Sequence, residues 1–268
     1  MQPSPPGLRR SSLATLRPPQ VTRALVHATT VLTTRDQERV LRVDMRPLVI
    51  HLLAGLEQAG IARVVITLGH DAAQVAECVT AYGFASLQID FVYLTLGSSA
   101  GAVWSNLANS VIAARGIFTG KAPLLILRAD HLYDARLLRI IADAPLSPTG
   151  RGCQAFALID DSPAITSWAA DAPVTFAPNW ARVALSAQDR SRAIRYGARL
   201  GSFDAIVAGE AYAATPRIFE LLASQLQQAA RYAAGLSQTR DCNAHFALLS
   251  AGVASALAIA GLPARSLT

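Results

Sequence analysis

Short apolar runs alternate with longer amphipathic stretches over the first half of this chain. The apolar runs are rich in Val, Ile and Leu and end at turn-forming residues, which is typical of strands buried on both faces of a sheet. The stretches between them repeat apolar residues at helical spacing. Strands are expected at 23–28, 62–69, 87–94 and from 124 up to Asp130, and helices at 47–60, 72–83 and, after a small-residue turn, within 97–115. This alternation predicts βαβ units with right-handed crossovers, and hence an α/β fold with a mostly parallel sheet covered by helices on both faces.

Capping residues support the expected helices. Pro47 suits the first turn of a helix, where its missing N–H would have no helical partner in any case, and Gly60 suits the C-terminal end of that helix. Asp71 can cap the next helix through its carboxylate. His51 falls on the apolar side of the first helix, which favours a hydrogen-bonded core or boundary histidine over a ligand.

After Gly150 the pattern becomes less regular. A strand is expected at 153–160, a small hairpin from 181–187 and 192–197, a longer strand at 203–215, and helices that begin at Pro216 and Asp241. The segment 163–180 contains prolines and tryptophans and is expected to be an irregular excursion. Residues 246–264 carry no charge, so they are consistent with a membrane-spanning helix or with a buried helix followed by a core strand. Their serines, glycines and proline favour the buried interpretation.

The apolar run that begins at Leu124 ends at a carboxylate followed by an imidazole, in LLILRADHLYD (124–134), and this segment is the best candidate for chemistry. In open α/β sheets, ligands bind at the carboxyl ends of the strands. Asp130 follows this strand directly, and a carboxylate there is suited to a magnesium ion that holds nucleotide phosphates. The alternative is that Asp130 caps the helix beginning near Ala135, although Asp134 is better placed for that role.

The net charge of +6 does not indicate a nucleic-acid partner. Residues 1–35 contain five arginines and no acidic residue, which leaves 19 basic against 18 acidic residues in the remainder. The body of the chain is therefore close to neutral and shows no basic patch. The basic residues are 23 Arg and one Lys, so a function that usually requires lysine would have to use arginine here.

The chain is expected to form one domain, 23–268, after an extension at 1–22 that is either disordered or a targeting peptide. Its three cysteines are far apart in sequence, which indicates neither a disulfide framework nor a zinc site and favours a cytoplasmic setting. No G-x-G-x-x-G motif follows the first strand, and no G-x-S-x-G motif occurs. A dinucleotide-binding domain and a serine hydrolase are therefore disfavoured.

Four segments together resemble one enzyme family. RPLVIHLLAGLEQAGIARVVITLGH (46–70) is similar to the "rPLI" helix, "aGi" turn and "vvv.GY" strand of the MobA-like or sugar-phosphate nucleotidyltransferases. LLILRADHLYD (124–134) resembles their "lL..sDHlfD" strand. LGSFDAIVAGEAYAATPRIFELL (200–222) and DCNAHFALLSAGVASALAIAG (241–261) resemble two patterns of the inositol-1-phosphate cytidylyltransferase group within that family.

The resemblance implies a three-layer αβα sandwich with a Rossmann-like sheet, of the nucleotide-diphospho-sugar transferase type. It implies a magnesium-dependent enzyme that transfers a nucleotidyl group, with CTP as the favoured donor, to a phosphorylated polyol or sugar and releases pyrophosphate. It also implies a functional link to a membrane CDP-alcohol phosphotransferase.

The resemblance assigns roles to individual residues. Asp130 would hold the metal ion, and Arg39 would neutralise charge on the triphosphate as the second catalytic residue. Arg199 and Asp204 would face the acceptor. The nucleotide would contact Ala28, Thr29, Thr30, Thr33, Arg35, Ser99 and Gly101.

The chain departs from the family in its first signature loop, usually "LAAGxGxRl". The corresponding residues are HATTVLTTR (27–35), in which Thr30 and Leu32 replace the glycines that let backbone N–H groups approach the phosphates. The lysine of the family falls near Arg39, and its second metal-binding carboxylate has no counterpart that can be assigned. These departures leave a second hypothesis open, a catalytically impaired relative with a structural or regulatory binding role.

Overall fold

The computed structural model describes residues 21–28, 42–69, 72–94, 106–118, 122–146, 155–171, 182–185, 187–188, 193–197, 202–217, 219–220, 223–224 and 264–266. Its elements are β1 (Arg23–Ala28), β2 (Arg42–Val43), β3 (Arg46–Pro47), α1 (Leu48–Gln58), β4 (Arg63–Leu68), α2 (Ala72–Tyr82), β5 (Gln88–Tyr93), α3 (Asn106–Ala114), β6 (Leu124–Arg128), α4 (Ala135–Ala142), β7 (Ala155–Asp160), α5 (Pro163–Asp171), β8 (Arg182–Leu185), β9 (Ala193–Gly197), β10 (Ala205–Ala214) and β11 (Ala264–Ser266). Residues described after Pro216 are helical as well.

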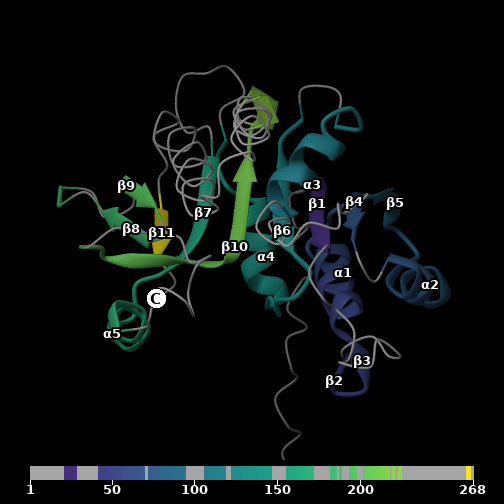
Figure 1. The fold of residues 1–268 in the computed structure, drawn as a ribbon, viewed down its shortest axis with the longest axis horizontal. Helices are drawn as coiled ribbons and strands as arrows, with labels where there is room; N and C mark the ends of the chain where they lie inside the picture. Colours follow the sequence, from purple (N-terminus) through teal and green to yellow (C-terminus); the bar gives the residue numbers. More distant parts are fainter. Residues whose placement is uncertain are drawn as a thin grey trace, which may run out of the picture.

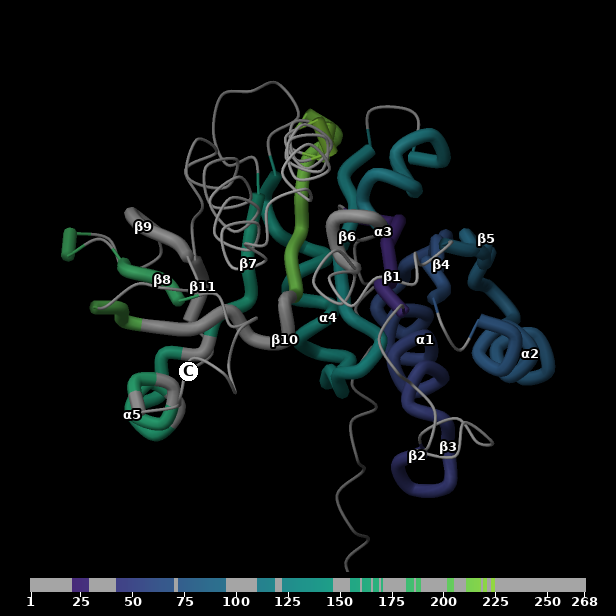
Figure 2. The backbone as a smooth tube through the Cα atoms, in the orientation of Figure 1, coloured from purple at the N-terminus to yellow at the C-terminus, as the bar shows by residue number. Residues whose placement is uncertain are grey.

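A nine-stranded sheet forms the centre of the described part of the chain, and β2 and β3 form a separate two-stranded sheet. Seven strands of the larger sheet follow the order β11-β7-β10-β6-β1-β4-β5, and β8 and β9 extend it from β10. Figure 1 shows these strands in this order from left to right, and the backbone tube of Figure 2 follows the same path. Strands β6, β1, β4 and β5 are mutually parallel, whereas β10 runs antiparallel to both β6 and β7. The expected mostly parallel α/β sheet is therefore confirmed.

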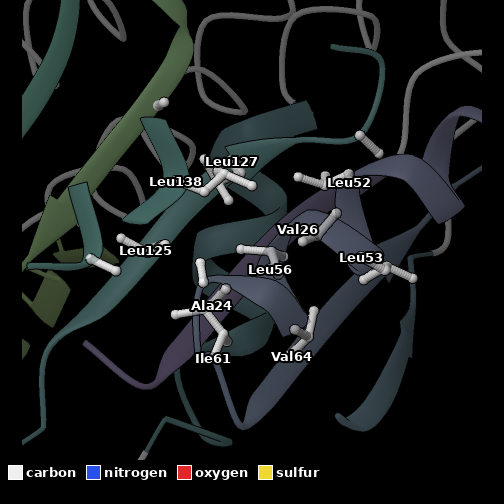
Figure 3. Close-up of a cluster of buried hydrophobic side chains, with 14 of the residues drawn as sticks. Ala24, Val26, Leu52, Leu53, Leu56, Ile61, Val64, Leu125, Leu127 and Leu138 are labelled. Atoms are coloured by element: carbon white, nitrogen blue, oxygen red, sulfur yellow. The ribbon is translucent and has the colours of Figure 1, made fainter. Parts of the chain in front are cut away.

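A continuous apolar core lies between one face of the sheet and helices α1 and α4. Val26 from β1 and Leu127 from β6 face Leu56 of α1 and Leu138 of α4 in this cluster (Figure 3). The two helices pack closely at Gly55, where an added β-carbon would lie 2.9 Å from a methyl group of Leu138. A small residue at this position of α1 therefore allows α4 to pack closely against α1.

Helix α3 and the helical residues after β10 cover the opposite face. Phe118, which follows α3, packs edge-to-face against Phe219, with ring centroids 5.7 Å apart. Arg115 and Glu220 form an ion pair at 2.7 Å between the same two elements. The sheet therefore has helices on both faces, which completes the expected three-layer αβα arrangement.

Local signals located most elements of the first half correctly. Pro47 immediately precedes α1, and the Nε2 atom of His51 lies 2.8 Å from the carbonyl oxygen of Val43, so this histidine is hydrogen-bonded at a boundary as expected. Strands β8 and β9 form the expected antiparallel hairpin, and β10 is the expected long strand.

The prediction of an irregular excursion over 163–180 was wrong for the first half of this segment, because Pro163–Asp171 forms helix α5. Pro163 occupies the first position of the helix, where proline has no energetic disadvantage. The backbone N–H of Thr166 donates to the carbonyl of Ser162 at 3.0 Å, and its hydroxyl donates to the same carbonyl at 3.1 Å. The proline that was taken to break helical structure therefore begins it. Residues 172–180 lie outside the described part of the chain.

No helix in the described part of the chain is long and apolar enough to cross a membrane. Most of 246–264, for which the sequence left that alternative open, is outside the described residues. Its last residue, Ala264, begins strand β11, which pairs parallel with β7. The sheet therefore contains a strand at the end of this segment, as the buried interpretation expects.

Candidate active site

The carboxyl ends of strands β1, β4 and β6 meet at one edge of the sheet. These strands are parallel, and their register places His27 opposite both Thr67 and Arg128. The backbone N–H of Ala129 donates to the carbonyl of His27 at 2.9 Å, which extends the pairing of β1 and β6 past the end of β6. The predicted site residues Ala28 and Asp130 therefore lie at the same edge, where open α/β sheets bind ligands.

The carboxylate of Asp130 lies within a compact charged cluster. The Nε atom of Arg128 donates to Oδ1 of Asp130 at 2.9 Å, and Nη2 of Arg128 donates to Oδ2 at 2.6 Å. The Nδ1 atom of His131 lies 2.7 Å from Oδ1. The Asp130 and Arg128 side chains are 22% and 15% exposed, so the ion pair is largely withdrawn from water.

This cluster keeps Asp130 ionised. Partial burial raises the pKa of the Asp130 carboxyl, but hydrogen bonds and charges from Arg128 and His131 outweigh burial and hold that pKa well below its usual range. A carboxylate that stays negative throughout the physiological pH range is suited to holding a cation. In this structure the cation is the guanidinium of Arg128.

Asp130 does not cap the helix that follows it. Asp134 is the N-cap of α4, and its Oδ1 atom accepts from the backbone N–H of Arg136 at 2.7 Å. The alternative role considered for Asp130 is therefore filled by the residue that the sequence favoured. In the turn between β6 and α4, the hydroxyl oxygen of Tyr133 accepts from the backbone N–H of Arg128 at 3.3 Å.

A buried polar network lies beneath the same edge. The Nδ1 atom of His27 lies 2.8 Å from Oγ of Ser110 in α3, and the Thr67 hydroxyl donates to that Oγ at 2.7 Å. All three residues are buried. Burial, together with the positive charge of Arg128, lowers the pKa of His27 to about 3, so its imidazole is neutral at pH 7.

Asp204 occupies a different part of the sheet. Its Oδ2 atom accepts from the backbone N–H of Leu185 at 2.8 Å, and its own N–H donates to the carbonyl of Val183 at 2.8 Å. These contacts attach strand β8 to the beginning of β10. In the described part of the chain no hydrogen bond or ion pair joins Asp204 to Asp130.

The other predicted site residues lie outside the described part of the chain. They are Thr29, Thr30, Thr33, Arg35, Arg39, Ser99, Gly101 and Arg199. Their roles in nucleotide or acceptor binding stay predictions.

Sequence reasoning missed Arg128 and the His27 network. Arg128 ends an apolar strand two residues before Asp130, and residues two apart on an extended chain point to the same face. This spacing was a usable signal for the ion pair. His27 likewise is a polar residue inside an apolar strand, but its partners Ser110 and Thr67 come from distant segments that only the fold brings together.

The described residues do not fit a metal ion at Asp130 in this arrangement. Magnesium is usually bound by one or two carboxylates together with phosphate and water oxygens. Both carboxylate oxygens of Asp130 already accept from Arg128, and one also contacts His131. Among the described residues, no group of three or more His, Cys, Asp and Glu side chains could hold a metal ion.

Solved nucleotidyltransferase structures share the fold of this chain. No protein-family model matches the sequence, and a search of curated proteins gives no match either. An inositol-1-phosphate CTP transferase from T. maritima has a TM-score of 0.58 at 12% identity, covering 93% of this chain and 87% of that one. A UDP-glucose pyrophosphorylase solved with UDP-glucose has a TM-score of 0.59 at 11% identity, covering 92% and 91%.

A third similar structure is a Bacillus anthracis protein assigned as a glucose-1-phosphate thymidylyltransferase and solved with sucrose. Its TM-score is 0.56 at 10% identity, and the match covers 92% of this chain and 87% of that one. All three matches span nearly the whole chain, and at such low identity they report on the fold and not on the chemistry. The chain therefore has the three-layer fold found in these nucleotidyltransferases.

Proposed function

We propose that this protein transfers a nucleotidyl group from a nucleoside triphosphate to a phosphorylated small molecule and releases pyrophosphate. The observation that carries the proposal is the Arg128–Asp130–His131 cluster, which is charged and partly buried at the carboxyl edge of β6. It lies beside the end of β1, where the predicted phosphate-binding loop begins. The shared fold with nucleotidyltransferases supports the same reaction class, since this edge is where ligands bind in such sheets.

The reaction asks little covalent chemistry of the protein. A phosphate oxygen of the acceptor attacks the α-phosphorus of the triphosphate, a new P–O bond forms, and the bond from the α-phosphorus to the bridging oxygen breaks. Pyrophosphate leaves with that oxygen. The acceptor phosphate is already ionised at pH 7, so no side chain has to remove a proton. The protein contributes by holding two anions in line and by neutralising the charge that develops.

Particular residues are proposed for these tasks. Arg35 and Arg39 neutralise the triphosphate, and Ser99 and Gly101 lie toward the base. Arg199 binds the acceptor phosphate. We propose CTP as the donor and a phosphorylated polyol or sugar as the acceptor, in the cytoplasm, where the product could supply a membrane CDP-alcohol phosphotransferase. Magnesium at Asp130 stays a prediction from the resemblance, and it would require Arg128 to release the carboxylate.

The second candidate function is a catalytically impaired relative with a structural or regulatory binding role. The ion pair between Arg128 and Asp130 favours it, because the carboxylate expected to serve catalysis is already neutralised by a neighbouring side chain. The changes at Thr30 and Leu32 in the first signature loop point the same way.

Thermal melting with each of the four nucleoside triphosphates, followed by an assay for pyrophosphate release, separates the two functions. A ligand at a hundredfold its dissociation constant stabilises a protein by about 2.7 kcal/mol, which is visible as a higher melting temperature. We expect the largest shift with CTP, and pyrophosphate release when a phosphorylated polyol is added. Binding without pyrophosphate release from any acceptor tested would support the impaired relative. Failure to bind any nucleotide would contradict the transferase and favour the impaired relative, with a protein as the partner to search for.

A further inference from the structure

We infer that Arg128, and not a metal ion, is the cation that Asp130 holds, and that Asp130 is a positioning residue that orients the Arg128 guanidinium toward the phosphates of the ligand. The part of this inference that concerns phosphate rests on the proposed function. The part that concerns the metal ion rests on the geometry of the ion pair alone.

The pair has the geometry of a two-point contact. Nε and Nη2 of Arg128 each donate to a different oxygen of Asp130, at 2.9 Å and 2.6 Å. A planar guanidinium matches a carboxylate in this way, and such a contact fixes the orientation of the side chain as well as its position. Arg128 is therefore held in one orientation relative to the turn that follows β6.

A metal ion at Asp130 would have to displace this contact. The oxygen Oδ1 accepts from Arg128 and contacts His131, and Oδ2 accepts from Nη2 of Arg128 at 2.6 Å, the shortest of the three contacts. The pair is mostly shielded from solvent, so separating it would remove a charge-assisted contact between two partly buried groups.

The position of Arg128 is suited to an anionic ligand. It is the last residue of β6, opposite His27, and so lies at the edge where Ala28 ends β1. The Tyr133 hydroxyl fixes its backbone N–H. A guanidinium has five N–H donors, and Asp130 uses two of them. A charged phosphate accepts from a guanidinium more strongly than a neutral acceptor does.

The first experiment titrates the full chain with Mn²⁺ in the absence of nucleotide. The signal of free Mn²⁺ in electron paramagnetic resonance measures how much of the ion is bound. We expect the wild type and the Asp130→Asn variant to bind Mn²⁺ equally, or equally little. Loss in Asp130→Asn of a Mn²⁺ site that the wild type has would overturn the inference, because Asp130 would then be a metal ligand.

The second experiment measures binding of inorganic tripolyphosphate and of CTP by calorimetry in EDTA. We expect the wild type to bind both, and the Arg128→Gln variant to bind about tenfold or more weakly, since a charge-assisted hydrogen bond to phosphate is lost. Arg128→Lys keeps the charge but not the fork and should be intermediate. The matched control is Arg136→Gln, which removes an arginine from a similar pair with Asp134 that is exposed to solvent.

A third pair of variants separates binding from folding. Arg128→Gln leaves the Asp130 carboxylate without its partner, so the double variant Arg128→Gln/Asp130→Asn, which removes both charges, provides a folded reference. Because Asp130 acts through Arg128, we expect Asp130→Asn to weaken tripolyphosphate binding in the wild type but to have no further effect in the Arg128→Gln background. Independent effects of the two substitutions would contradict the positioning role.

The outcomes distinguish this inference from the proposed function. If CTP binds only with Mn²⁺ and that binding is lost in Asp130→Asn, the inference fails while the nucleotidyltransferase proposal stands. Unchanged CTP binding in Arg128→Gln has the same meaning. If the wild type binds no nucleotide with or without metal, the proposed function fails together with the phosphate role of Arg128, and the Mn²⁺ titration still decides whether Asp130 holds a metal ion.

Discussion

The Nδ1 atom of His27 lies 2.8 Å from the Oγ atom of Ser110, and both residues are almost completely buried. The contact joins strand β1, which lies inside the sheet between β6 and β4, to helix α3, which covers one of its faces. Thr67 on β4 donates to the same hydroxyl, so one serine connects three elements beneath the candidate site. Removing a partner from such a network leaves the remaining polar groups buried and unsatisfied, which costs more than the hydrogen bond itself gains.

We predict that Ser110→Ala lowers the free energy of unfolding by about 1–3 kcal/mol, because His27 and Thr67 both lose a buried partner. Urea denaturation followed by circular dichroism measures this change. The matched control is Thr80→Ala, whose hydroxyl donates to Ala76 on the exposed side of α2 and should matter by less than about 0.5 kcal/mol. Equal stabilities of Ser110→Ala and wild type would show that the network does not stabilise the fold.

Acid should destabilise the protein through His27. Its pKa is about 3 in the folded state against 6.5 for an unperturbed histidine, so between these values the unfolded state binds a proton that the folded state does not. His27 therefore does not lower the free energy of unfolding above about pH 6.5. Below that pH it lowers the free energy of unfolding by up to about 1.4 kcal/mol per pH unit, until the folded state also binds the proton near pH 3.

The His27→Gln variant tests this linkage. Glutamine can still hydrogen-bond to Ser110 but does not titrate, so the variant should lose less stability than the wild type between pH 7 and pH 5. Urea denaturation of both proteins at these two pH values gives the difference, and the carboxylates that also titrate in acid are common to both. Parallel loss of stability in the two proteins would contradict the lowered pKa of His27.

Gly55 should resist enlargement because of its contact with α4. A β-carbon at this position would lie 2.9 Å from a methyl group of Leu138, which is buried in the core and would have to shift. We expect Gly55→Ala to destabilise the protein by about 1 kcal/mol, although alanine favours a helix over glycine by a similar amount. Gly116→Ala, with no atom near the added carbon, is the control, and Leu138→Val should partly rescue Gly55→Ala.

Asp204 offers a test that separates support from acceptor binding. Its carboxylate accepts from the backbone N–H of Leu185, so Asp204→Ala should lower the free energy of unfolding by about 0.5–1.5 kcal/mol. Asp204→Asn keeps an oxygen in that place and should remain close to wild type. If Asp204 also binds the acceptor, Asp204→Asn will raise the KM for the acceptor without changing stability, whereas a purely supporting role predicts an unchanged KM.

Local sequence signals accounted for much of the fold and for the position of Asp130 in the candidate site. The order of strands and helices through β6 follows from apolar runs and helical spacing, and the cap of α4 by Asp134 follows from side-chain chemistry within one turn. The same reasoning placed Asp130 at the carboxyl edge of a central strand, because the end of an apolar run marks the end of a buried strand. The prolines after residue 160 misled it, since a proline at the first position of a helix looks the same in sequence as one that prevents a helix.

The sequence by itself determined most of the strands and helices through β6 and which carboxylate reaches the ligand edge, because these depend on neighbours within a few residues. Only the tertiary structure decided that β10 runs antiparallel between β6 and β7 and that Ser110 and Thr67 meet His27. Strand order and buried polar contacts depend on pairings between segments that are distant in sequence. Their free energies are set by register and burial, which no local pattern specifies.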